Sequence, residues 1–351
     1  STQAKTLFPY TTLFRSGVTQ VLTPGILTDS SFLAESQPSY ICALFSDNHS
    51  WSLVSAEVLA GQLYATSSLV HEQKLLETEL ARFSPEHILL SQDVQNGALV
   101  DACRKQGYFV STVPCDPECS AWLEQQFDQG VYQAVQQTSQ TRHSMELLYG
   151  YMRKYAHDSL NSFKTVHFYN PEDYLLLDQA TQRNLELFVN TYDGTSANSV
   201  YSVINATSTA SGARMLKKRL VRPLLDRSMI EHRLDLVSYI KGDVRIMDSL
   251  QRMLQTVGDL ERVVGRIALG RARLEDYVHL CTALQTLQTA PSYQDEPQFL
   301  KIIREHIRSF EPLQQLLMLS LNDDRSKEWI IKEGFDERLD RLRLLVHTTH
   351  E

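Results

Sequence analysis

The sequence predicts a mixed-sheet α/β domain followed by an all-α helical bundle, because the residue pattern changes once, near residue 133. Before that point, short runs rich in β-branched and aromatic residues come first and then alternate with helical patterns, as in an α/β domain. After it, apolar residues recur at helical spacing in one segment after another. These segments show no fixed-length repeat, so a bundle is favoured over a solenoid.

Three strands are expected between residues 39 and 68. The runs SYICALFS and SWSLVSAE are separated by a turn signal at residues 47–49, and GQLYATSS completes an antiparallel meander. In residues 71–83 the leucines recur at helical spacing, and Pro85 ends this expected helix.

Helix and strand then alternate up to residue 127. HILLS is typical of a buried strand, and GALVDACRKQG of a helix that ends at Gly107. YFVSTVP and CSAWLEQQF follow as the next strand and helix. This order of elements completes the predicted α/β domain.

The helical part begins with an amphipathic helix in residues 141–157. Asp226 and Asp259 are each expected to cap a following helix. We expect Gly265 to permit close helix packing. Further apolar stripes predict helices at Leu274 to Leu284, Phe299 to Phe310, and Phe335 to Val346.

Composition limits the classes of protein to consider. The 351 residues are 42% hydrophobic and 22% charged, which is an ordinary globular balance. Apolar runs fall short of the roughly 18 residues that a membrane span needs, and five cysteines, an odd number, favour free thiols in the cytoplasm. The net charge of −8 argues against a protein that coats nucleic acid through a general positive field.

Five segments carry motifs of one family, in family order. They are VTQVLTPGILTD from Val18, LDQATQRNLEL from Leu177, TASGARMLKKRLVRPL from Thr209, VGDLERVVGRIAL from Val257 and IKEGFDERLDRLR from Ile331. Together they resemble the MutS family of DNA mismatch-repair sensors. The family residues to which the resemblance gives a structural or transmission role are Asp178, Thr181, Arg183, Asn184, Glu186, Thr209, Gly212, Arg214, Pro223, Asp259 and Arg262.

The resemblance implies a domain order. Residues 17–135 are expected to form an RNase H-like connector domain, residues 136–330 a helical core domain, and residues 331–351 the start of a lever helix toward a clamp. Residues 1–16 have no relation to the family pattern and resemble adapter-derived sequence, so we expect them to be non-native. No GxxxxGK[ST] phosphate loop occurs in the sequence, so we expect an internal fragment that is not itself an enzyme.

The resemblance also implies partners for the parent protein. It would bind mismatched duplex DNA as a homodimer, use ATP and Mg²⁺ in a domain beyond this chain, and recruit a MutL-type protein. For this chain we expect no cofactor, no metal and a monomer.

Within the chain, a basic cluster is the candidate for DNA contact. Arg214, Lys218 and Arg222 are each one helical turn apart, so one stripe could face phosphates. Lys217 is the fourth candidate. The alternative interpretation is an ion-paired or solvated helix face.

Other classes of protein remain open at this stage. Asp47, Glu57 and Asp101 would be needed for a two-metal nuclease, but nothing in the sequence predicts their convergence. Cys115 and Cys119 form one CxxxC pair, whereas zinc sites usually need two, and His87 and His143 lie elsewhere in the sequence. A MutS homologue acting in recombination and a helical scaffold without a nucleic-acid role are the remaining alternatives.

Overall fold

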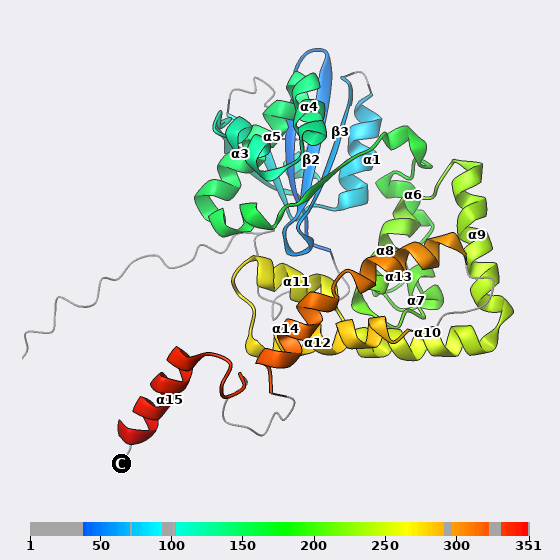
Figure 1. The fold of residues 1–351 in the computed structure, drawn as a ribbon. Coiled ribbons are helices and arrows are strands. Elements are labelled where there is room, and N and C mark those ends of the chain that lie inside the picture. The colour runs from blue at the N-terminus through cyan, green and yellow to red at the C-terminus, as the bar shows by residue number, and fades with distance from the viewer. Residues whose placement is uncertain are drawn as a thin grey trace, which may run out of the picture.

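The computed structural model describes residues 38–70, 72–92, 101, 103–290, 297–322 and 331–349. An α/β region and a helical region follow one another along the chain, as expected (Figure 1). Residues 1–16, the motif from Val18 and the first part of the helix expected before Gly107 lie outside the described residues, as does the side chain of Phe299.

A six-stranded mixed sheet forms the α/β region. Its strand order is β5-β4-β1-β2-β3-β6, in which β1, β2 and β3 pair antiparallel and β4, β5 and β6 add parallel pairs. The expected meander is therefore confirmed. The strands are β1 (Ile41–Ser46), β2 (Ser50–Glu57), β3 (Gln62–Leu69), β4 (His87–Ser91), β5 (Phe109–Val113) and β6 (Thr165–Phe168).

Helices cover both faces of this sheet (Figure 1). Because side chains alternate along a strand, Ile41 and Ala43 belong to one apolar core, and Cys42 and Leu44 belong to the other. The second core is closed by α1 (Gln73–Phe83). The first is closed by α3 (Cys119–Gln126), α4 (Gln129–Gln137) and α5 (Ser139–Tyr155).

The sheet layer extends beyond the expected boundary at residue 135. Helix α5 packs on β1 and β2, with Met145 and Met152 fully buried in the first core. Strand β6 then pairs with β3 at the sheet edge. The amphipathic pattern of α5 is that of a helix on a sheet face, which periodicity alone does not separate from a bundle helix.

The helical region follows from residue 179. The expected caps are confirmed, because the backbone N–H of Met229 donates to Asp226 at 2.7 Å and that of Arg262 donates to Asp259 at 3.4 Å. Its helices are α6 (Gln179–Asn184), α7 (Val200–Ile204), α8 (Ala210–Val221), α9 (Arg227–Gly242), α10 (Val244–Val257), α11 (Leu260–Ala268), α12 (Leu274–Gln288), α13 (Gln298–Arg308), α14 (Glu311–Ser320) and α15 (Glu337–Thr349).

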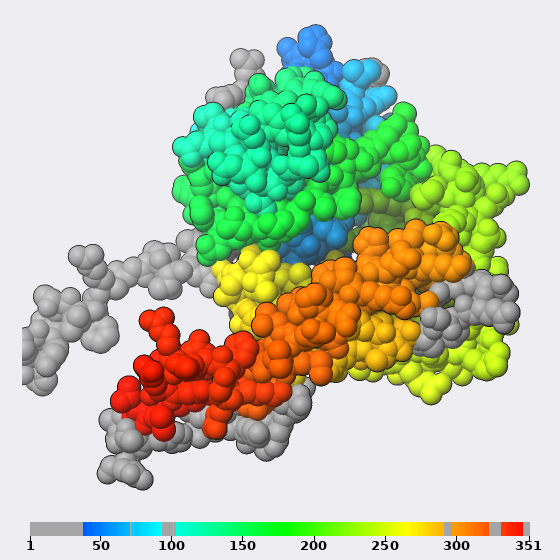
Figure 2. Space-filling view, in the orientation of Figure 1, coloured from blue at the N-terminus to red at the C-terminus, as the bar shows by residue number. Residues whose placement is uncertain are grey.

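The helices differ in how they lie relative to the sheet. Helix α11 lies against the short 3-10 turn η1 (Val58–Ala60), which joins β2 to β3. Helix α15, labelled in Figure 1 and drawn as red atoms in Figure 2, lies apart from the α/β region. The stripe expected to run from Phe299 to Phe310 in one helix is divided, because α13 ends at Arg308 and α14 begins at Glu311.

Candidate interdomain site

The basic stripe of α8 points toward the α/β region and into contacts with α11. The Thr209 hydroxyl caps the helix by accepting from the backbone N–H of Gly212 at 3.0 Å. From that start, the i, i+4 spacing places Arg214, Lys218 and Arg222 on one face. Each of the three meets a different part of the molecule.

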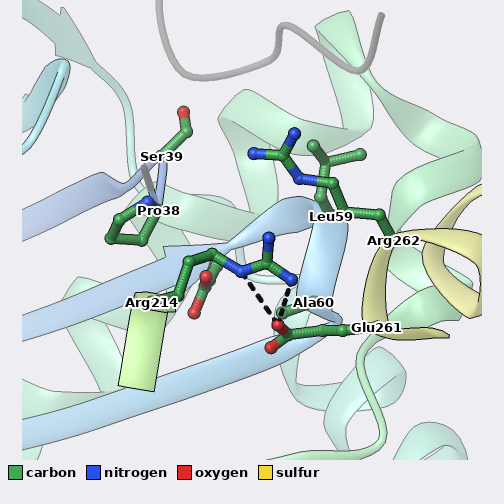
Figure 3. Close-up of a pocket in the computed structure, with 8 residues that line it drawn as sticks. Pro38, Ser39, Leu59, Ala60, Arg214, Glu261 and Arg262 are labelled. Carbon is green, nitrogen blue, oxygen red and sulfur yellow. Dashed lines mark hydrogen bonds and ion pairs between the residues drawn. The ribbon is translucent and has the colours of Figure 1, made fainter. Parts of the chain in front are cut away.

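Arg214 is buried and held by two carboxylates of the α11 segment. Its guanidinium donates to both oxygens of Asp259, at 2.6 and 2.9 Å, and to Glu261 at 3.0 Å. Figure 3 shows Arg214 directed at Glu261, beside Leu59 and Ala60 of the β2–β3 connection. Burial is the largest single influence on Asp259 and opposes its charge, but the hydrogen bonds and charges of Arg214 and Arg262 together outweigh burial and lower the pKa of this carboxyl.

Lys218 joins α8 to the end of strand β2. Its ammonium lies 2.7 Å from Glu57, which is only 3% exposed, and 3.4 Å from the Tyr64 hydroxyl on β3. Burial raises the pKa of Glu57, and the ion pair with Lys218 partly offsets that effect. A single change at either residue would leave a buried charge without its partner.

Arg222 completes the stripe through aromatic contacts. The centre of its guanidinium lies 4.2 Å from the ring centroid of Phe83 and 5.4 Å from that of Tyr169. Such cation–π contacts contribute most where the cation is desolvated. The C-terminal end of α8 is therefore attached to α1 and to the segment after β6.

The segment between the two regions is anchored by a second buried charge pair. Glu79 and Arg82 form an ion pair on α1, and both side chains are fully buried. The Tyr169 hydroxyl donates to Glu79 at 2.7 Å, and Arg82 donates to the carbonyl of Leu175 at 2.9 Å. The amide of Leu175 in turn donates to the carbonyl of Pro223 at 2.9 Å, so the linking segment is bonded to both α1 and the end of α8.

Helix α11 adds a close backbone contact. A Cβ atom added to Gly265 would lie 1.9 Å from the carbonyl oxygen of Leu59, so no larger residue fits without a shift. The tight packing expected for Gly265 is thus confirmed. Its partner is the α/β region rather than another helix.

The stripe expected to face DNA is directed inward. Arg214 and Lys218 are ion-paired and Arg222 is stacked, which favours the alternative interpretation of an ion-paired helix face. The ammonium of Lys217 lies 4.8 Å from the Tyr201 ring centroid. Sequence periodicity places residues on one helix face but does not tell what lies opposite.

Several family-motif residues shape the local backbone. Asp178 caps α6 by accepting from the amide of Thr181 at 2.7 Å. Glu186, in a left-handed conformation with φ 49°, accepts from the amide of Thr191 at 2.7 Å. Arg183 and Asn184 line a cleft beside α8.

The described residues hold no assembled metal site for either the nuclease or the zinc-site alternative. Among these residues, no three His, Cys, Asp or Glu side chains gather as metal ligands. Glu57 is paired with Lys218, and Cys119 lies in the apolar core, where burial raises the pKa of its thiol. The ring of His87 is bonded to Ser111 at 2.8 Å and to Tyr151 at 3.1 Å.

Fold and site together define a multidomain protein in which a helical region is held to an α/β domain by buried charges on α8. The contacts of Arg214, Lys218 and Arg222 are called the α8 joint below. The family model described as MutS domain III matches residues 180–340. Two relatives named DNA mismatch repair protein MutS, from Clostridium botulinum (strain 657 / Type Ba4) and Caldanaerobacter subterraneus subsp. tengcongensis, are each 27% identical over 94% of this chain. These matches support a fragment of a MutS family protein.

The chain spans 36% and 39% of the length of these two relatives. The name of these relatives describes their full-length proteins, of which this chain matches only a part. None of the described helices combines the length and the apolar character of a membrane-spanning segment.

Proposed function

We propose that this chain is part of a DNA mismatch repair protein and acts there as a mechanical link. The α/β region, ending near residue 170, would be the connector, and the helical region up to residue 330 would be the core. Residues 331–351 would begin the lever toward a DNA clamp. The names of the relatives and the match to MutS domain III support this proposal.

The observation that carries the proposal is the α8 joint. One helix bears cations that pair with the sheet through Lys218 and with α11 through Arg214. A rigid helix bonded at both places moves as a unit with both, so displacement of the helical region is passed to the connector. Such coupling requires a packed element with alternative arrangements and needs no catalytic residue.

Other parts of the parent protein would supply the chemistry. We propose that they bind ATP with Mg²⁺, form the homodimer, and together with the connector recruit a MutL-type partner in the cytoplasm. This chain alone would be a monomer without a cofactor. Its DNA binding would be weak, since its net charge is −8 and each of its four candidate cations is already paired with a carboxylate or stacked on an aromatic ring.

Binding of the purified chain to homoduplex and single-mismatch DNA tests the proposal, with and without ATP, at low and physiological salt. We expect at most weak, salt-sensitive binding with no mismatch preference and no effect of ATP. Salt-resistant discrimination of the mismatch would contradict this division of labour, because a recognition surface would then lie within these residues.

A further inference from the structure

A cleft opens where α1, α6 and α8 meet, next to the charged joint. Its lining is rich in cations, with Glu86 as the one carboxylate among the described lining residues. The cationic lining residues are Arg82, Arg183, Lys217, Lys218 and Arg222. This is a local reversal of charge in a chain whose net charge is −8.

Two of the five cations are neutralised within the fold. Arg82 pairs with Glu79, and Lys218 pairs with Glu57. In the described part of the chain, no ion pair with a carboxylate involves Arg183, Lys217 or Arg222. With Glu86 also in the lining, the cleft therefore holds an excess of about two positive charges.

Burial makes two of these charges costly. The pKa of Lys217 is lowered by burial, and the Tyr201 ring is a weaker partner than an anion would be. Arg222 lacks hydrogen-bond partners for two of its nitrogens within the described part of the chain. Its Nε and Nη2 atoms are shielded from solvent and have no hydrogen-bond partner among the described residues.

The two unpaired nitrogens of Arg222 lie on one edge of the guanidinium. That edge presents two parallel N–H donors, the geometry that binds an oxyanion in a bidentate manner. Arg222 lines the cleft and stacks on Phe83, so binding through this edge requires the side chain to leave that ring. An anion bound there would satisfy both donors and compensate the neighbouring charges.

We infer that the cleft binds a compact small molecule carrying two or more negative charges on phosphate groups, held by Arg183, Lys217 and Arg222. The overall negative charge of the chain repels a long polyanion such as duplex DNA, whereas a small anion meets only the local cations. The bound molecule would bridge α6, α8 and the end of α1, and would stabilise the arrangement of the two regions.

Isothermal titration of the 351-residue chain with inorganic pyrophosphate tests the inference. We expect saturable binding, weakened about tenfold or more by Lys217→Gln and by Arg183→Gln, since each removes one charge-assisted contact. Both side chains are at least partly exposed, so these variants should fold. The matched control is Arg219→Gln, which removes an exposed charge from α8 outside the cleft and should leave affinity unchanged.

A parallel titration with adenosine diphosphate distinguishes two sources of the phosphate. Tighter binding than pyrophosphate would indicate an organic phosphate whose ring also contacts the cleft, and equal binding would indicate recognition of phosphate alone. No saturation by either probe below about 1 mM would overturn the inference. It would also fail if Arg219→Gln weakened binding as much as Lys217→Gln, because the effect would then be one of general charge.

Discussion

The α/β region and the helical region are stabilised in different ways. Two large apolar cores fill the two faces of the sheet, whereas the one buried apolar cluster described within the helical region consists of Cys281, Leu284, Leu317 and Leu321. Of the described residues, none in α9 is buried, and Leu234 and Val237 on that helix are each 58% exposed.

Charged contacts take the place of an apolar core in the helical region. Arg214 with Asp259 and Glu261, and Arg266 with Asp276, join separate helices or their caps. Ion pairs are directional, so they hold helices in defined positions while contributing less to stability than a core of equal size. The difference suits a stable platform joined to a region that changes position.

The largest effect should come from a cavity in the sheet core. Leu89 is fully buried on β4, so Leu89→Ala should lower the free energy of unfolding by about 4 kcal/mol. Urea unfolding followed by the fluorescence of Trp51 and Trp122, in a Trp329→Phe background, reports on this region. The matched control Leu344→Ala removes a leucine that is 65% exposed and should change little, and equal losses would contradict the contrast between regions.

Removing the central cation of the joint should act mainly on the helical region. Arg214→Met leaves Asp259 and Glu261 without their partner and should cost about 3 kcal/mol. Helical circular dichroism should then be lost at lower urea than tryptophan fluorescence. The control Arg227→Met removes an exposed ion pair with Glu231 and should have no measurable effect. A helical region as stable as the unmodified one would show that the charges do not hold it.

A steric change tests the contact between the regions without altering charge. Gly265→Ala places a methyl group against the Leu59 carbonyl and should cost about 2 kcal/mol as α11 is pushed from the sheet. Gly242→Ala on α9, where an added Cβ meets nothing within 4 Å, is the matched control and should be neutral or slightly stabilising. Thermal unfolding of both variants provides the comparison, and equal melting temperatures would remove α11 from the joint.

Acid should produce a smaller effect through Asp259. The pKa of this carboxyl is lowered in the folded chain, so its contribution to stability is present above the ordinary aspartate pKa and is lost as pH falls through the lowered value. The free energy of unfolding, measured from pH 5 to pH 3, should fall less steeply in Asp259→Asn, which is already less stable at pH 5. Identical slopes would mean that Asp259 does not carry this dependence.

Local elements were predictable from the sequence because their signals are local. Alternating and helical apolar patterns placed the strands of the meander, HILLS and the caps at Asp226 and Asp259 where the structure has them. Strand β6 was missed, since four residues of mixed polarity form a strand only by pairing with β3, about 100 residues earlier.

The site depended on information that a single sequence lacks. The i, i+4 spacing of Arg214, Lys218 and Arg222 predicts a common face, but whether phosphate or carboxylate faces it is decided by tertiary packing. Glu57 shows the same limit. From the sequence, Glu57 is a candidate carboxylate of a two-metal nuclease. In the structure it is the partner of Lys218, 161 positions further along the chain. The sequence signal for this pairing is that Glu57 ends a strand whose other residues are mostly buried, because a buried carboxylate needs a cation as its partner.

A double-mutant cycle between Glu57→Gln and Lys218→Met tests the central claim most directly, namely that α8 joins the two regions. The free energies of unfolding of the two single variants and the double variant give the coupling between β2 and α8. The joint predicts a coupling of about 1 kcal/mol or more, against none for the exposed pair Arg227 and Glu231 measured in the same way. Additive effects of Glu57→Gln and Lys218→Met would contradict the account, because α8 would then not connect the helical region to the sheet.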